Sequence, residues 1–166
     1  MVKIDFLDLE INEKIYKRII IVGIILILGY LIITFSCFAF PKVYKVDSKT
    51  ISDDENKVKT GISEIYRGNL KLRLSGFAYK EGENIKSFNS YYILKNTENG
   101  KMYKITAEMK DIPELNNIDE NMQYSKGGMV SESFIIGIKK GIYDLYILYQ
   151  NNDNNLLVNT GLQVNI

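Results

Sequence analysis

The chain has 166 residues, enough for one domain of ordinary size and a short additional segment. Its 21 basic and 20 acidic side chains leave a net charge of +1, so it lacks the basic excess typical of nucleic-acid-binding proteins. It has no His, no Trp and a single Cys, Cys37, which excludes an imidazole metal ligand, an intrachain disulfide and a cysteine-rich zinc site. Its many Ile, Lys, Asn and Tyr residues have AT-rich codons, which indicates a low-GC bacterium.

An uncharged apolar run, residues 19–40, stands near the N-terminus and ends directly before Pro41. A helix rises about 1.5 Å per residue, so a run of this length crosses the roughly 30 Å hydrocarbon core of a bilayer. A cleaved signal peptide usually has a shorter apolar region and small residues at its exit, whereas this run ends in Phe-Ala-Phe. Lipid attachment at Cys37 is disfavoured because the run continues past it. The pattern favours an uncleaved signal anchor over residues 19–40.

The charges beside this run differ only slightly between its two sides. The basic residues are Lys3, Lys14, Lys17 and Arg18 before the run, and Lys42, Lys45 and Lys49 after it. Positive flanks tend to stay in the cytoplasm, and a short tail before a β-rich domain is the usual arrangement of a type II protein. We expect residues 1–18 to form a cytoplasmic tail and the C-terminal part to lie outside. The expected location is the cell membrane, with a single pass and the lipid bilayer as a partner.

Residues 41–60 have a polar composition that indicates a spacer. From residue 61 onward the hydrophobic pattern has a period of two, most clearly in residues 70–78, whose apolar side chains share one face. Asn99-Gly100 is a strong hairpin signal, and Gly161 is expected at a bulge in the last strand. Residues 151–155, NNDNN, are typical of a hairpin tip, while carbonyl ligation of Ca²⁺ is the alternative.

About six or seven short strands, spaced near ten residues apart, are predicted within residues 61–166. The predicted fold class is therefore all-β: an antiparallel, immunoglobulin-like β-sandwich preceded by one N-terminal transmembrane helix. Gly141-Ile142-Tyr143 also fits a tyrosine corner, in which the phenol bonds to nearby backbone.

Tyrosines on the predicted strands are the main candidates for binding. Tyr143 and Tyr149 fall on apolar strand faces and are expected in the core. Tyr79, Tyr91 and Tyr146 lie opposite the most apolar face of their strands, so they are predicted to form an exposed, partner-facing patch. A tyrosine ring suits both roles, because it packs well across strands and also makes binding contacts with one apolar and one polar end.

The stretch RLSGFAYKEGENIKSFNSYYILKN and the later KKGIYDLYILYQNND carry a resemblance to a known module. A strand that ends in Ser-Gly-aromatic-Ala, a polar turn and a Tyr-rich strand are similar to a β-sandwich accessory module of Gram-positive cell-surface proteins and teichoic-acid-type glycosyltransferases. The resemblance covers roughly residues 68–166. Phe77 stands where many such modules have Trp. The resemblance implies a non-catalytic, envelope-associated domain, and it supplies no site residues.

The sequence predicts no catalytic residue, cofactor or metal site. A Ser-Lys dyad is the mechanism open to a surface protein without His. Ser131 and Ser133 lie near Lys139 and Lys140 in sequence, but nothing in the sequence fixes them together. The leading hypothesis is a membrane-anchored binding or scaffolding module of the cell envelope, whose partner is an envelope glycopolymer or another membrane protein. The alternatives are a small accessory subunit of a membrane complex for transport, secretion or polymer synthesis, and, last, a surface enzyme.

Overall fold

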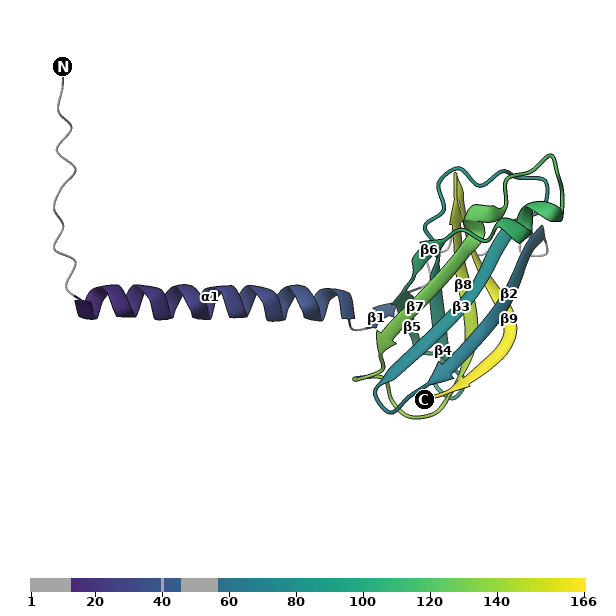
Figure 1. Cartoon of the computed structure of the whole chain (residues 1–166). Coiled ribbons are helices and arrows are strands. Elements are labelled where there is room, and N and C mark those ends of the chain that lie inside the picture. The colour runs from purple at the N-terminus through teal and green to yellow at the C-terminus, as the bar shows by residue number, and fades with distance from the viewer. Residues whose placement is uncertain (1–12, 40, 46–56) are drawn as a thin grey trace, which may run out of the picture. The chain divides into compact units, whose positions relative to one another are not determined.

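The computed structural model describes residues 13–39, 41–45 and 57–166 of the chain (Figure 1). It divides into two compact units, one up to Phe38 and one from Ala39 onward. Most of the predicted tail, at residues 1–12, and the middle of the predicted spacer, at residues 46–56, lie outside the described residues.

Helix α1 (Glu13–Ala39) forms the first unit. It begins six residues before the predicted run, and its segment Ile15–Ser36 has a mean hydropathy of 2.8 with no part buried against protein. Hydroxyl groups within it bond to the preceding turn, from Thr34 Oγ1 to the Tyr30 carbonyl at 2.7 Å and from Ser36 Oγ to the Ile32 carbonyl at 2.8 Å. These bonds satisfy polar side chains without water. The chain thus has one N-terminal helix apolar enough to cross a membrane, a property that signal sequences share.

The second unit is mostly β-structure arranged in two antiparallel sheets (Figure 1). Its strands are β1 (Lys42–Tyr44), β2 (Val58–Arg67), β3 (Lys71–Lys80), β4 (Tyr91–Asn96), β5 (Met102–Thr106), β6 (Glu108–Lys110), β7 (Gly128–Phe134), β8 (Ile142–Asn151) and β9 (Asn154–Asn165). One sheet has the order β1-β5-β4-β8-β9 and the other the order β2-β3-β7-β6. The all-β class and the sandwich-like pair of sheets therefore agree with the prediction.

Two of these strands reach into residues 41–60, which the composition indicated to be a spacer. Strand β1 pairs with β5 through Lys42↔Lys104 and Tyr44↔Met102, and β2 begins at Val58, which is buried. Polar and apolar residues mix in both segments, so their strand character depends on the neighbouring strand rather than on their own pattern.

The core lies between the inner faces of the two sheets and follows the predicted alternation. Its fully buried side chains include Leu72, Leu74, Tyr92, Leu94, Ile105, Tyr143, Leu145, Ile147 and Tyr149. The Tyr143 hydroxyl donates to the Lys139 carbonyl at 2.6 Å, which is the bond expected at a tyrosine corner. Leu70 and Leu162 do not follow the alternation, because both are exposed. No described core cluster draws on α1, so the second unit has a core of its own.

The predicted turns occur where glycine permits a positive φ angle. Gly100 (φ 69°) closes the β4–β5 hairpin, and Gly161 (φ 74°) lies where the β8–β9 register shifts, as expected for a bulge.

The Asn-rich turn between β8 and β9 is held to the β3–β4 connection. Side-chain amides of Asn151, Asn152 and Asn154 donate to Glu83 Oε1 at 3.1, 2.9 and 2.8 Å.

Candidate binding face

The five-stranded sheet has an outer face, opposite to the core, on which the strand register aligns side chains in three rows. The rows are Thr106, Tyr91, Leu148 and Leu157; then Lys42, Lys104, Ile93 and Tyr146; then Tyr44, Met102, Lys95 and Asp144. The second and third rows combine lysines with aromatic and aliphatic groups, whereas the first row contains no lysine. We call this surface the outer face.

An apolar layer lies at the centre of the outer face. Ile93, Leu148 and Leu157 are buried, although they point away from the core. Half-buried groups pack around them: Tyr44, Tyr91, Met102 and Tyr146. Among the residues that the structure describes, this cluster consists only of strands of the same sheet. The aromatic rings therefore rest on a firm aliphatic base and are partly open to solvent.

Two lysines lie over the tyrosine rings of this face. The Lys104 ammonium is 3.4 Å from the centroid of Tyr91, and the Lys95 ammonium is 5.8 Å from the centroid of Tyr146. A cation within about 6 Å of a ring centroid is attracted by the negative charge of the ring face. Tyr91 and Tyr146 thus each form a unit with a positive charge.

Among the residues that the structure describes, the outer face has a local excess of positive charge. Lys42, Lys95 and Lys104 stand against Asp144, whose carboxylate accepts a hydrogen bond from the Gln163 amide at 2.9 Å. Partial burial, and then repulsion by Lys42, lower the pKa of Lys104. A bound anion would relieve this repulsion, so the arrangement suits a negatively charged ligand.

Of the three tyrosines predicted to be exposed, the structure brings Tyr91 and Tyr146 together on the outer face and separates Tyr79 from them. The prediction of an exposed Tyr79 is wrong, because the residue is only 6% exposed. It stacks on Tyr124, with ring centroids 4.5 Å apart. Tyr124 comes from the segment of short helices η3 (Pro113–Asn117) and η4 (Ser125–Gly127). This irregular segment, rather than solvent, covers Tyr79 at the C-terminal end of β3.

The sequence pattern does not mark Lys95, Lys104 or Met102 as part of a candidate site. Each lies on a strand where lysine or methionine alternates with buried residues, a pattern that alone indicates only a solvated face. Lys104 lies near Tyr91 across the two strands. This could be found from the sequence only if the pairing of β4 with β5 were known.

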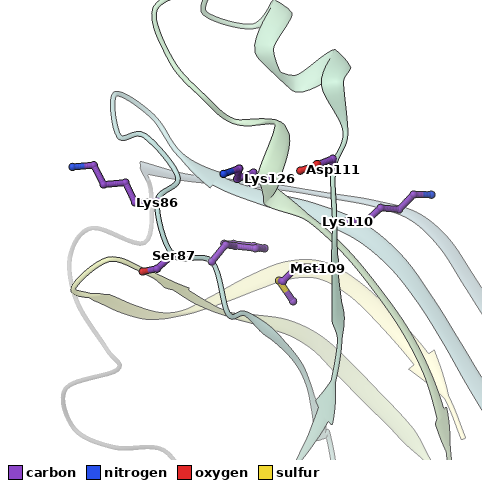
Figure 2. A pocket seen from close by; sticks show the side chains of 7 residues that line it. Lys86, Ser87, Met109, Lys110, Asp111 and Lys126 are labelled. Atoms are coloured by element: carbon purple, nitrogen blue, oxygen red, sulfur yellow. The ribbon is translucent and has the colours of Figure 1, made fainter.

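A hollow of about 370 Å³ lies beside β6 and the β3–β4 connection. It is lined by Lys86, Ser87, Phe88, Met109, Lys110, Asp111 and Lys126. Figure 2 shows Lys86 and Lys110 pointing away from one another, so its lysines do not converge on one point. The hollow is therefore a weaker candidate for an anion than the outer face.

The residues considered for a Ser-Lys dyad have other partners. Ser131 is buried in β7, and its hydroxyl donates to the Thr106 carbonyl at 2.7 Å. Lys139 lies 3.9 Å from the Glu98 carboxylate. Within the described ranges, no group of three or more Cys, Asp or Glu side chains is placed to hold a metal ion.

Comparisons of the chain with protein-family models, with curated proteins and with solved structures found no match. Function is therefore inferred from the chemistry of the outer face.

Proposed function

We propose that this chain is a membrane-anchored, non-catalytic binding module of the bacterial envelope, and that the outer face contacts its ligand. The observation that carries the proposal is the pairing of Tyr91 with Lys104 and of Tyr146 with Lys95 on one sheet face. Such a face offers flat apolar rings for stacking and fixed positive charges for anions.

The ligand class that fits this chemistry is an anionic envelope glycopolymer. Tyrosine rings pack against the C–H faces of sugars or polyols, while lysines bind phosphate or carboxylate as point charges. A long polymer also suits a flat face better than a closed pocket, because several repeats contact it at once. The resemblance to accessory modules of cell-surface proteins points in the same direction.

We further propose that the sandwich is immunoglobulin-like. The orders β2-β3-β7-β6 and β5-β4-β8-β9 correspond to the A-B-E-D and C′-C-F-G orders of immunoglobulin domains. The bond from Tyr143 to the Lys139 backbone lies at the start of β8, the equivalent of strand F. Strand β1 is then an addition at the edge of the C′ side.

In this proposal α1 is not cleaved and serves as a single-pass anchor. Its N-terminal side lies in the cytoplasm and the β-domain lies outside. Its support is the length and apolar character of α1 and the small excess of basic residues before it. Protease added to intact cells should then remove the β-domain. Full protection of the domain, with a known external protein cleaved in the same sample, would reverse the orientation.

The test of function uses the β-domain, residues 41–166, which has a core of its own. Its affinity is measured for a poly(glycerol phosphate) chain and for a neutral glucan of similar length. We expect salt-dependent binding of the phosphate polymer alone. The double variant Lys95→Gln/Lys104→Gln should bind about tenfold more weakly, a loss of about 1.4 kcal/mol.

Tyr66→Ala is the matched control for Tyr91→Ala, and the affinities of the two variants for the phosphate polymer are compared. Tyr66 is exposed in β2 of the other sheet, so its removal should leave affinity unchanged, while Tyr91→Ala weakens binding. Equal binding of the neutral glucan, or equal losses in both variants, would contradict a role of the outer face. If the outer face binds one specific membrane protein in a way that depends on Tyr91, and binds no polymer, the accessory-subunit alternative would be favoured.

A further inference from the structure

Two turns at one end of the sandwich expose large aliphatic side chains. The β2–β3 turn presents Leu70, which is 57% exposed, and the β7–β8 loop presents Ile136, which is 52% exposed. The Ile135 amide donates to the Leu70 carbonyl at 2.9 Å, so the two turns lie side by side. We call this surface, with Arg67, Lys139 and Lys140, the Leu70 end.

The fold itself does not require these side chains to be apolar. Ile135 and Ile138 of the same loop point inward and are buried, whereas Ile136 lies between them and points outward. Gly137 (φ 87°) makes the turn that separates them. Turn positions in solvent usually carry polar residues, so the two adjacent exposed aliphatic groups form a small apolar patch at this end.

The charges around these side chains are positive. Arg67 and Lys140 line a hollow of about 120 Å³ together with Leu70 and Ile136. Among the described residues, neither Arg67 nor Lys140 forms an ion pair, whereas nearby Lys71 is paired with Glu132. Lys139 lies 3.9 Å from Glu98, and both side chains are about 70% exposed (72% and 68%), so this pair is weak.

We propose that the Leu70 end docks on the surface of an anionic lipid bilayer. Leu70 and Ile136 enter the boundary between headgroups and acyl chains, and Arg67, Lys139 and Lys140 lie at the level of the lipid phosphates. Aliphatic side chains flanked by basic ones are the combination that binds such interfaces. This proposal rests on α1 spanning a membrane and is independent of the ligand of the outer face.

A lipid surface fits this end better than a protein partner. Stable protein interfaces bury about 800 Å² on each side, with a broad apolar centre, whereas the apolar groups here are two side chains on neighbouring turns. Two side chains alone bind a bilayer weakly. The anchor keeps the domain close to the bilayer at a high effective concentration, so a weak contact is sufficient.

The test exploits the absence of Trp from the sequence. The full chain is reconstituted in phosphatidylglycerol–phosphatidylcholine vesicles with brominated acyl chains, carrying Leu70→Trp or Ile136→Trp as its single indole. We expect the bromines to reduce the fluorescence of either variant about twofold or more, because the side chain reaches the acyl boundary. Ile118→Trp is the matched control, since Ile118 is 54% exposed but follows η3 at the other end of the strands.

Replacing Arg67 and Lys140 with Gln in the Leu70→Trp chain should remove most of the quenching, as should vesicles of phosphatidylcholine alone. The β-type circular dichroism spectrum of each variant checks that the fold is retained. Three results would overturn the proposal: no quenching at either turn, equal quenching of Ile118→Trp, or quenching that is independent of lipid charge. Because no polymer is present, none of these results depends on whether the outer face binds one.

Discussion

The Nζ atom of Lys104 lies 3.4 Å from the centroid of the Tyr91 ring. Tyr91 of β4 is paired with Thr106 of β5, so Lys104 is its diagonal neighbour on the outer face. Such a contact contributes about 0.5–1 kcal/mol at an exposed site and more when water is excluded. It holds the ammonium against the ring, and the face therefore presents a positive charge at a fixed place.

Removing the charge of Lys42 should raise the pKa of Lys104. Partial burial is the larger cause of its lowered value and Lys42 is the second, so Lys42→Gln returns the pKa only part of the way to its ordinary range. Nuclear magnetic resonance titration of ¹³C-methylated lysines measures the change. Lys59→Gln, in the other sheet, is the control and should leave the pKa of Lys104 as it is. An unchanged pKa in Lys42→Gln would show that the two ammonium groups do not interact.

Two leucines of one alternating run should respond very differently to truncation. Leu74 is fully buried in the core, so Leu74→Ala should lower the free energy of unfolding by about 2–5 kcal/mol. Leu70 is exposed, and Leu70→Ala should change it by less than about 0.5 kcal/mol. Urea unfolding of the β-domain measures both values. Equal losses would mean that Leu70 is packed in solution.

The Glu83 carboxylate should stabilise the contact between two turns. It accepts hydrogen bonds from the amides of the Asn-rich turn and lies 3.6 Å from the Lys80 ammonium. Glu83→Gln removes the charge, so we expect a loss of about 1–3 kcal/mol in the free energy of unfolding. Glu81→Gln is the control, because the pair that Glu81 forms with Lys59 is exposed, and the change should cost less than about 1 kcal/mol. Similar losses in both variants would argue against the turn contact.

The β-domain should lose stability in alkali. Burial raises the pKa of Tyr149 to about 12 and raises that of Tyr92 still further. An unfolded tyrosine ionises near pH 10, so the stabilisation is complete below about pH 10 and is lost as the pH rises toward 12. The free energy of unfolding should therefore fall across this range.

The variant Tyr149→Phe isolates one contribution to this fall. It should show a shallower decline between pH 10 and 12 than the wild-type domain, because phenylalanine does not ionise. The lowered pKa of Lys104 makes the free energy of unfolding rise with pH, which is the opposite effect. Both proteins contain Lys104, so this contribution cancels in the comparison. Tyr66→Phe, at an exposed position, is the control and should retain the wild-type slope. Identical slopes for wild type and Tyr149→Phe would contradict the burial of that ionisable group.

Local patterns predicted the features that depend on a few neighbouring residues. A long run without a charge or a polar face indicated the helix, and a period of two indicated strands with one buried side. Asn99-Gly100 and Gly161 marked a hairpin and a bulge because both need a positive φ angle. Strand β1 was missed because its three residues become a strand only by pairing with β5.

The period of two separates the two faces of a strand, but it does not say what covers each face. Tyr79, Tyr91 and Tyr146 looked equivalent in sequence. The segment with η3 and η4 folds over Tyr79, whereas the register of β4, β5 and β8 places the other two rings beside Lys104 and Lys95. The sequence by itself determined the helix, the β class and the strand faces, because these depend on local periodicity. Only the tertiary structure decided which tyrosines are open and which charges adjoin them, because contacts between residues distant in the chain make that choice.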